Sequence, residues 1–171
     1  VYGLSTMQDV LLHSLNTGTI FVNQRLGEGF YGYVERFGFG ALTQVDLANE
    51  VKGYVRRPGD VGWSESDLGA NSFGQGIAVT PMQMVRMTAA IASNGTMWAP
   101  NFVQRVQPPG GQPTYVAEPQ AERQLNYGED VFEALRESMC QVTLAEDGTA
   151  RFIFEEWYEW QNTDLIICGK T

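Results

Sequence analysis

The first forty residues alternate between apolar stretches at helical spacing and short glycine-containing breaks. A capping-box pattern at Thr6 precedes the first stretch, so a helix is expected over about 7–14. A second apolar segment, 20–26, ends at Gly27, a residue type that commonly ends helices. A third, 30–37, carries its apolar side chains on one face. The pattern therefore predicts three short helices in this part of the chain.

The middle of the chain combines a long polar connection with a strong helix start. Residues 43–76 are rich in Gly, Asp, Asn and Ser and have few periodic apolar positions, so they predict a long connecting region. Thr80 then offers a helix cap, Pro81 suits the first turn, and Gln83 can bond back to the cap. An apolar stripe follows and stops at Asn94, so a helix is expected between these points.

The last third of the chain mixes extended segments with one amphipathic helix. Residues 96–106 and 113–118 predict a hairpin around a Pro-Pro-Gly-Gly turn, and 129–143 predict a helix. Its expected buried face holds Val131, Leu135, Ser138 and Met139. The aromatic segment 152–160 fits a helix or an irregular loop equally well. The unbroken apolar run 164–168 is typical of a strand covered on both faces.

Composition narrows the class of protein. The chain has 171 residues, 43% of them hydrophobic, which suits one globular domain with a real core. Eleven basic against twenty acidic residues give a net charge of −9, so the basic face that nucleic-acid binding requires is not expected. No apolar run reaches the ~18 residues that a membrane span needs. These counts favour a folded, acidic domain that binds no nucleic acid.

The rare residues limit the possible chemistry. Cys140 and Cys168 do not have the spacing of metal ligands, and together with the single histidine, His13, they are too few for a zinc site. We therefore expect two buried thiols and no metal or cofactor. The only lysines are Lys52 and Lys170, and the second stands at the very end of the chain. Because the chain stops inside a predicted strand, we expect it to be a piece of a longer protein.

Two short polar clusters could carry chemistry. The side chains of Ser14 and Asn16 would point in different directions on a continuous helix. A helix break at Asn16 would turn both side chains into one cleft. The simpler alternative is that Asn16 only caps a helix. Lys170 and Thr171 offer an ammonium and a hydroxyl suited to a carboxylate, or only a solvated charge. A phosphate-binding loop is excluded, because position 164, where its first glycine would stand, is Asp.

The combination and order of these clusters resemble a known family. Ser14-Leu15-Asn16 resembles the second motif of the serine β-lactamases and penicillin-binding proteins, and Lys170-Thr171 resembles the start of their third, Lys-Thr-Gly. Blocks similar to penicillin-binding proteins lie between them at Phe37–Gly40, Thr43–Leu47 with Glu50, Asn71–Gln83 and Ala89–Gly95. The Gly-Gln-Gly and Thr-Pro-x-Gln patterns within these blocks favour the monofunctional, class B transpeptidases over the β-lactamases.

The resemblance implies both a fold and an activity. The expected fold is α+β and of the β-lactamase/transpeptidase type, with residues 1–171 forming an incomplete domain: mostly the helical lobe, a hairpin and one core sheet strand. The implied activity is that of a serine-type D-Ala-D-Ala transpeptidase that cross-links peptidoglycan stem peptides and binds β-lactam antibiotics. It would act in elongation or division at the extracytoplasmic face of the bacterial membrane, in a membrane-anchored parent, with other cell-wall synthesis proteins as possible partners.

The resemblance also implies a role for each motif residue. Ser14 would relay a proton to the leaving amine, and Lys170 would tune Ser14 electrostatically. Asn16 would hold the substrate amide, and Thr171 would bind the terminal carboxylate. The loop residues expected to be structural and near the site are Gln75 and Gly76.

One departure from the family is decisive for activity. None of the serines is followed by a lysine three residues later, so the Ser-x-x-Lys motif that supplies the nucleophile is absent. We therefore expect this chain to be inactive alone. If sheet neighbours are absent, the segment 165–168 exposes unpaired backbone, so self-association through this strand is also expected.

The sequence leaves open two alternatives for the function and one for the state of the cysteines. The chain could be a catalytically dead sensor or scaffold, or a relative of the serine β-lactamases. A β-lactamase needs a base that activates water, for which Glu50, Glu65 and Asp67 are the available candidates. An extracytoplasmic setting would also permit a disulfide between Cys140 and Cys168 instead of two thiols.

Overall fold

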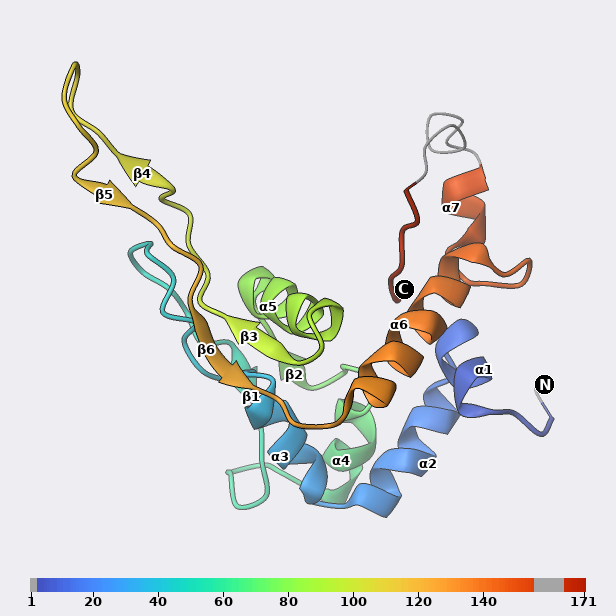
Figure 1. Ribbon diagram of the computed structural model, residues 1–171. Coiled ribbons are helices and arrows are strands. Elements are labelled where there is room, and N and C mark those ends of the chain that lie inside the picture. Colours follow the sequence, from blue (N-terminus) through green and yellow to red (C-terminus); the bar gives the residue numbers. More distant parts are fainter. Residues whose placement is uncertain (1–2, 156–164) are drawn as a thin grey trace. The chain divides into compact units, whose positions relative to one another are not determined.

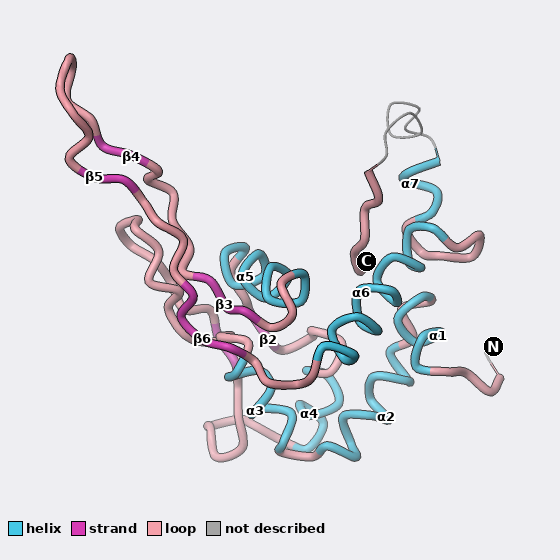
Figure 2. The backbone as a smooth tube through the Cα atoms, viewed as in Figure 1, coloured by secondary structure: helices cyan, strands magenta, loops and turns pink. Residues whose placement is uncertain are grey.

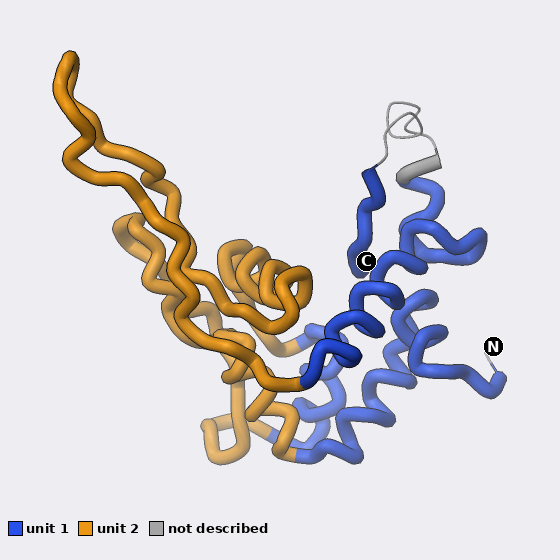
Figure 3. Tube along the Cα trace, viewed as in Figure 1, with its two compact units in different colours: residues 1–27, 64–75, 128–171 blue, residues 28–63, 76–127 orange. Residues whose placement is uncertain are grey.

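The computed structural model describes residues 3–155 and 165–171 and divides them between two compact units (Figures 1 and 3). Unit 1 combines residues 1–27, 64–75 and 128–171, and unit 2 combines 28–63 and 76–127. Each unit is thus assembled from segments far apart in the sequence. In the described residues, regular structure is helical in unit 1, whereas all strands belong to unit 2 (Figure 2).

The helices of unit 1 enclose a small apolar core. They are α1 (Met7–Leu12), α2 (Asn16–Leu26), α4 (Glu65–Asn71), α6 (Glu129–Leu144) and α7 (Arg151–Glu155). α6 is the longest of them and packs against α1, while α2 packs against α4. The buried apolar side chains of this unit are Val10, Leu12, Phe132, Val142 and Ala150.

The start of α1 confirms the predicted capping box. The Asp9 backbone N–H donates to Thr6 Oγ1 at 3.2 Å, and Asp9 Oδ2 accepts from the Thr6 N–H at 2.7 Å. The end is two residues earlier than predicted, because Ser14 adopts a left-handed conformation at φ 54°. α2 then begins at Asn16, before the expected apolar segment.

A close approach fixes how α2 lies against α1. A Cβ added to Gly18 would stand 2.3 Å from Val10 Cγ2, a distance that no real contact permits. Only glycine at this position lets the two helices meet at their present separation. The short connection between the helices is therefore held in place by packing on both sides.

The buried face of α6 differs in part from the predicted one. Val131 is 42% exposed, whereas its neighbour Phe132 is 1% exposed, so the expectation for Val131 is wrong. Leu135 and Met139 are partly buried, and the buried face continues to Val142. The prediction failed because Val131 and Phe132 are adjacent apolar residues in the first turn of the helix, and the sequence pattern alone did not show which of them faces inward.

The segment 165–171 is extended but belongs to no sheet, so the predicted strand covered on both faces is wrong. Leu165 and Ile166 are 68% and 67% exposed. The physical reason is that no strand among the described residues lies beside this segment to complete its backbone hydrogen bonds. The segment is attached to helix α6 instead.

A disulfide joins Cys140 of α6 to Cys168, so the expectation of two buried thiols is wrong. It closes a loop with a sequence separation of 28 residues, for which chain entropy alone predicts about 3–4 kcal/mol of stabilisation. An ordinary hydrogen bond contributes only about 0.5–1.5 kcal/mol, and ordering each residue costs about 1–2 kcal/mol. The disulfide is therefore the strongest single link between segment 165–171 and the rest of unit 1.

Unit 2 is an α+β arrangement of short elements. Its elements are α3 (Gly29–Arg36), β1 (Tyr54–Val55), β2 (Ile77–Ala78), α5 (Pro81–Ala92), β3 (Thr96–Trp98), β4 (Arg105–Val106), β5 (Tyr115–Val116) and β6 (Ala121–Gln124). They form three antiparallel two-stranded sheets, β1 with β2, β3 with β6 and β4 with β5. Helix α5 packs on β3, where Ala90 and Met97 are both fully buried.

The structure confirms the predicted hairpin, but it shows more regular structure in the connection 43–76 than the sequence predicted. β4 and β5 pair around the Pro-Pro-Gly-Gly turn, which confirms the hairpin, with Arg105 opposite Val116 and Val106 opposite Tyr115. The connection 43–76 is less irregular than predicted, since it contains β1 and α4. Both are short, and short elements leave little periodicity in a sequence.

Two further expectations concern membranes and the aromatic segment. Among the described residues, the helices are all too short or too polar to span a membrane. α7 covers residues 151–155, the beginning of the aromatic segment 152–160, and residues 156–164 lie outside the described part of the chain.

A buried amide organises the core of unit 2. Gln83 is 1% exposed, and its Nε2 donates to the carbonyls of Ala41 at 2.7 Å and Lys52 at 2.9 Å. Its Oε1 accepts from the N–H of Thr80 at 3.0 Å, completing the capping box of α5. One side chain thus satisfies three backbone groups and ties the loop 41–52 to the start of a helix.

Replacing Gln83 should destabilise the protein strongly. Gln83→Ala leaves the carbonyls of Ala41 and Lys52 and the Thr80 N–H without their partner, which should lower the free energy of unfolding by about 2–4 kcal/mol. Urea unfolding followed by circular dichroism measures this loss. Gln104→Ala changes an exposed glutamine of the same unit and is the matched control. Equal losses for both variants would contradict this role of Gln83.

Candidate active site

A cleft of about 280 Å³ opens in unit 1 where α1 and α2 meet the end of α4 and the C-terminal segment. Its lining residues are Val10, Leu11, Ser14, Asn16, Thr19, Ser72, Phe73, Lys170 and Thr171. The four residues expected to form a site therefore share one cavity, although they come from opposite ends of the chain.

The turn between α1 and α2 places Ser14 and Asn16 on the same side of the backbone. The Ser14 N–H donates to the Leu11 carbonyl at 3.3 Å, and the Leu15 N–H donates to the Val10 carbonyl at 3.0 Å. Because Ser14 is left-handed, the chain leaves α1 and re-enters a helix at Asn16. The expected helix break is thus present, but it precedes Asn16, which is the first residue of α2 and not its cap.

Lys170 makes the central contact of the cleft. Its Nζ donates to Ser14 Oγ at 2.7 Å and also to the Thr171 carbonyl. Partial desolvation lowers the pKa of the Lys170 ammonium. A hydroxyl that accepts a hydrogen bond from an ammonium gives up its own proton more readily, so this pair can act as a proton relay.

Thr171 is held by a residue that the sequence did not single out. Thr149 Oγ1 lies 2.6 Å from Thr171 Oγ1, and the Thr149 N–H donates to the carbonyl of Leu12 at 3.4 Å. The preceding Gly148 lets the chain pass the backbone of α6, because an added Cβ there would stand 2.5 Å from the Val142 carbonyl oxygen. Gly148 was the only feature of the sequence that could have pointed to the contact between Thr149 and Thr171.

The beginning of the block 71–83 contributes Ser72 and Phe73 to the lining of the cleft. Ser72 Oγ donates to the Gly69 carbonyl at 2.6 Å and to Thr19 Oγ1 at 3.3 Å. Both Ser72 and Thr19 line the cleft but were missed, because isolated hydroxyl residues carry no recognisable pattern.

Gln75 and Gly76, which were expected near the site, form an exposed loop after α4. The Gln75 N–H donates to the Ala70 carbonyl at 3.1 Å, and Gly76 has a φ of 122° that few other residues adopt. Neither residue lines the cleft. Their place in the structure is that of a turn.

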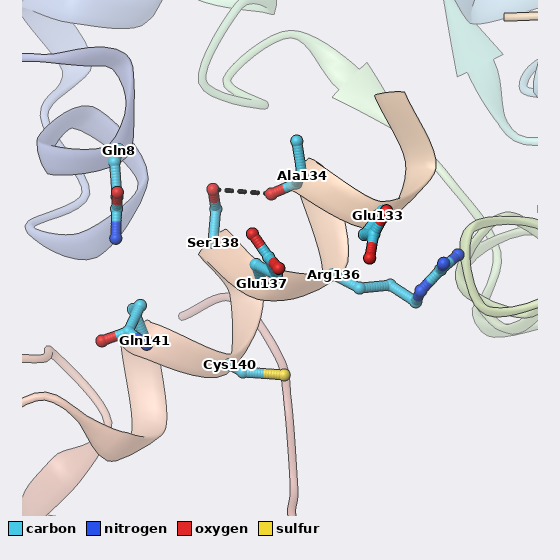
Figure 4. A pocket seen from close by; sticks show the side chains of 8 residues that line it. All are labelled: Gln8, Glu133, Ala134, Arg136, Glu137, Ser138, Cys140 and Gln141. Carbon is cyan, nitrogen blue, oxygen red and sulfur yellow. Dashed lines mark hydrogen bonds between the residues drawn. The ribbon is translucent and has the colours of Figure 1, made fainter. Parts of the chain in front are cut away.

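A second, larger groove of about 710 Å³ lies between Gln8 of α1 and α6 (Figure 4). Its other lining residues are Glu133, Ala134, Arg136, Glu137, Ser138, Cys140 and Gln141. The groove contains no motif residue, and Ser138 Oγ donates to the Ala134 carbonyl of its own helix at 2.8 Å. Within the described residues, no cluster of three His, Cys, Asp or Glu side chains is arranged to bind a metal ion.

Two of the three candidate bases for water activation already have structural tasks. Glu50, in unit 2, accepts hydrogen bonds from the Thr43 hydroxyl and N–H, both at 2.6 Å, and from the Gln44 N–H at 3.0 Å. These hydrogen bonds lower the pKa of the Glu50 carboxyl, and the bond from the Thr43 hydroxyl has the largest effect. Asp67 accepts from Ser64 in the capping box of α4. Glu65 stands in the first turn of the same helix, outside the cleft lining.

The comparison with protein families agrees with this geometry. The family model described as the penicillin binding protein transpeptidase domain matches residues 1–171. The chain belongs to this family. Among curated relatives, the stage V sporulation protein D of Bacillus subtilis is 31% identical over 172 residues, which are 99% of this chain and 25% of that protein. The chain thus spans about a quarter of the length of this relative.

Solved structures of penicillin-binding proteins show the same fold over part of their length. Penicillin-binding protein 2B of Streptococcus pneumoniae matches with a TM-score of 0.80 at 24% identity, covering 98% of this chain and 30% of that one. Penicillin-binding protein 3 of Mycobacterium tuberculosis, in complex with aztreonam, matches with a TM-score of 0.67 at 30% identity over 79% of this chain and 30% of its own. A complex of penicillin-binding protein PBP2 with MreC from Helicobacter pylori matches with a TM-score of 0.74 at 21% identity, over 91% of this chain and 28% of that one.

The Glu50 carboxylate should stabilise the protein in a pH-dependent way. Its pKa is lowered on folding, so its contribution is present above the ordinary glutamate pKa and is lost as the pH falls through the folded-state value. Glu50→Gln should lower Tm at neutral pH, and the difference from the parent should shrink as the pH falls below the ordinary glutamate pKa of about 4.3 and vanish below the folded-state pKa. Thermal unfolding at a series of pH values measures this.

Glu118→Gln, which changes an exposed carboxylate of the same unit, is the control and should leave Tm nearly unchanged. A difference between Glu50→Gln and parent that is independent of pH would show that the carboxylate charge is not what matters.

Proposed function

We propose that this chain forms part of the active site of a serine-type D-Ala-D-Ala transpeptidase that cross-links peptidoglycan stem peptides. The observation that carries the proposal is the 2.7 Å hydrogen bond from Lys170 Nζ to Ser14 Oγ. It joins the second and third motifs of the family in one cleft, with Asn16 and Thr171 beside them. Membership of the family supports the same assignment.

Ser14 and Lys170 would handle the proton of the leaving amine. Aminolysis of a D-Ala-D-Ala bond expels an amine, which must gain a proton as the bond breaks. Ser14 would deliver that proton, and the adjacent Lys170 ammonium would stabilise the oxygen that remains. Lys170 is in position to do this because its Nζ donates a hydrogen bond to Ser14 Oγ at 2.7 Å.

Asn16 and Thr171 would bind the substrate. The Asn16 side chain is exposed at the cleft, where its carboxamide can both donate to and accept from the peptide amide. The Thr171 hydroxyl and the Lys170 ammonium belong to residues that line the same cleft, and together these two groups suit the terminal carboxylate of the stem peptide. Thr149, which contacts the Thr171 hydroxyl, would orient it.

The acyl-transfer step itself requires a nucleophile that this sequence lacks. A serine of a Ser-x-x-Lys motif would attack the penultimate D-Ala carbonyl, form an ester and release the terminal D-Ala. No serine here has a lysine three residues later. The chain is therefore proposed to be inactive until a polypeptide segment with that motif completes the cleft.

The geometry favours a transpeptidase over a β-lactamase. Hydrolysis of the acyl-enzyme needs a carboxylate base at the site, but Glu50 and Asp67 are engaged with backbone and hydroxyl donors of their own loops. Among the described residues, no Asp or Glu side chain lines the cleft. An acyl-enzyme at this site would therefore react with an amine acceptor and not with water.

The proposed substrate and ligands fix the proposed location and partners. Peptidoglycan is cross-linked outside the cytoplasmic membrane, so the completed site would work on the extracytoplasmic face, and β-lactams would acylate it. Cell-wall synthesis proteins are proposed partners, in line with the MreC complex of the Helicobacter pylori relative. Self-association through the exposed segment at Leu165 and Ile166 stays a prediction.

The chain alone should form no covalent adduct with a fluorescent penicillin, because it has no Ser-x-x-Lys serine to acylate. Intact-protein mass spectrometry after incubation measures this directly. A stoichiometric adduct on this polypeptide would refute the assignment of the missing nucleophile.

Adding a companion polypeptide that carries the Ser-x-x-Lys helix and the remaining sheet strands should restore labelling. In that complex, Lys170→Ala and Ser14→Ala should each slow acylation at least about 100-fold, because each removes one half of the proton relay. Lys52→Ala removes the only other lysine and is the matched control. Equal rates for the Lys170 and Lys52 variants would overturn the proposed function.

A further inference from the structure

The segment that carries Lys170 and Thr171 is attached to one face of α6. Cys140 holds it through the disulfide to Cys168. One turn further along the helix, Thr143 Oγ1 donates to the Ile167 carbonyl at 2.5 Å. The Gly169 N–H donates to the Met139 carbonyl at 3.2 Å. Positions 139, 140 and 143 lie on the same side of a helix, so these attachments form one continuous seam.

The seam determines where Lys170 can reach. The Cα atoms of Cys140 and Cys168 are 4.0 Å apart. Lys170 follows Cys168 by two residues, so its Cα stays within about 7 Å of the Cys168 Cα in any conformation. From this position its Nζ reaches Ser14 Oγ on the opposite wall of the cleft.

We propose that the Cys140–Cys168 disulfide positions Lys170 against Ser14, so that the cleft is assembled only when the two cysteines are oxidised. Cys140 and Cys168 are positioning residues, since neither lines the cleft nor contacts Ser14. The inference rests on the proposed function for its catalytic meaning, but the positioning itself is a property of the described chain.

Noncovalent contacts alone hold the segment weakly. Leu165 and Ile166 are mostly exposed and bury little apolar surface. The hydrogen bonds of Lys170 and Thr171 are open to solvent, which competes for the same groups. Without the covalent bond, the entropy gained by releasing residues 165–171 outweighs these contacts.

The disulfide is accessible to a chemical reductant. Cys140 lines the open groove beside α1 (Figure 4), and Cys168 is exposed. A dithiol would supply two electrons and two protons: the Sγ–Sγ bond breaks, Cys140 and Cys168 become thiols, and the dithiol closes to its own disulfide. An oxidising compartment outside the cytoplasm would keep the bond formed.

Nuclear magnetic resonance of the intact chain tests the positioning without any β-lactam. Because the chain has only two lysines, ¹³Cε labelling of lysine gives one signal each for Lys52 and Lys170. On reduction with dithiothreitol, the Lys170 signal should titrate at a higher pH, since released Lys170 loses the desolvation that lowers its pKa. The Lys52 signal, from unit 2, should not change.

Amide exchange supplies a second readout of the same event. The Gly169 N–H, which donates to the Met139 carbonyl, should exchange at least about tenfold faster after reduction. Amides in α2 should keep their protection, which shows that unit 1 remains folded.

The double variant Cys140→Ala and Cys168→Ala should behave like the reduced protein and be insensitive to dithiothreitol. Thr143→Val, which removes one hydrogen bond of the seam but keeps the disulfide, is the matched control and should leave the Lys170 titration near that of the oxidised parent. An unchanged Lys170 titration and Gly169 exchange rate on reduction would overturn the proposal.

The same result separates this proposal from the proposed function. If reduction shifts the Lys170 titration while the reconstituted complex shows no penicillin labelling, then the positioning stands and the transpeptidase assignment fails. If labelling succeeds equally in oxidised and reduced protein, then the transpeptidase assignment stands and the positioning role fails.

Discussion

The hydrogen bond between Lys170 Nζ and Ser14 Oγ is the interaction on which the cleft depends, because it joins residues 156 positions apart in the sequence. Neither residue lies inside a regular element: Ser14 occupies a left-handed turn, and Lys170 lies in an extended tail. Each is placed by its surroundings, the turn by the packing of α1 against α2 and the tail by α6. The central contact of the cleft therefore joins two irregular segments, each held by neighbouring helices.

The long block 71–83, which resembles the family most specifically, contributes more to the scaffold than to the candidate site. Thr80 and Gln83 build a helix start whose side chains satisfy buried backbone groups, and Gln75 and Gly76 form a turn. Of this block, only Ser72 and Phe73, near its beginning, line the cleft. A long run of recognisable residues thus belongs mainly to the scaffold, whereas the residues of the proposed site come from the first and last parts of the described sequence.

Features that depend on neighbouring residues were predictable from the sequence, and those that depend on distant ones were not. The capping boxes at Thr6 and Thr80 and the hairpin follow from local rules and are confirmed. The tail at 165–168 was predicted to be a buried strand because its composition is that of one, but a strand needs partners. The Cys140–Cys168 pairing and the contact between Thr149 and Thr171 arise from tertiary proximity, which no spacing encodes.

Gly18 sets a limit on how the cleft can vary. The absence of a single methyl group allows α2 to lie directly on Val10, immediately behind the turn that presents Ser14 and Asn16. A side chain at this position would push α2 away from α1. The packing behind the turn that carries Ser14 and Asn16 therefore depends on a residue that contributes no side chain to the cleft.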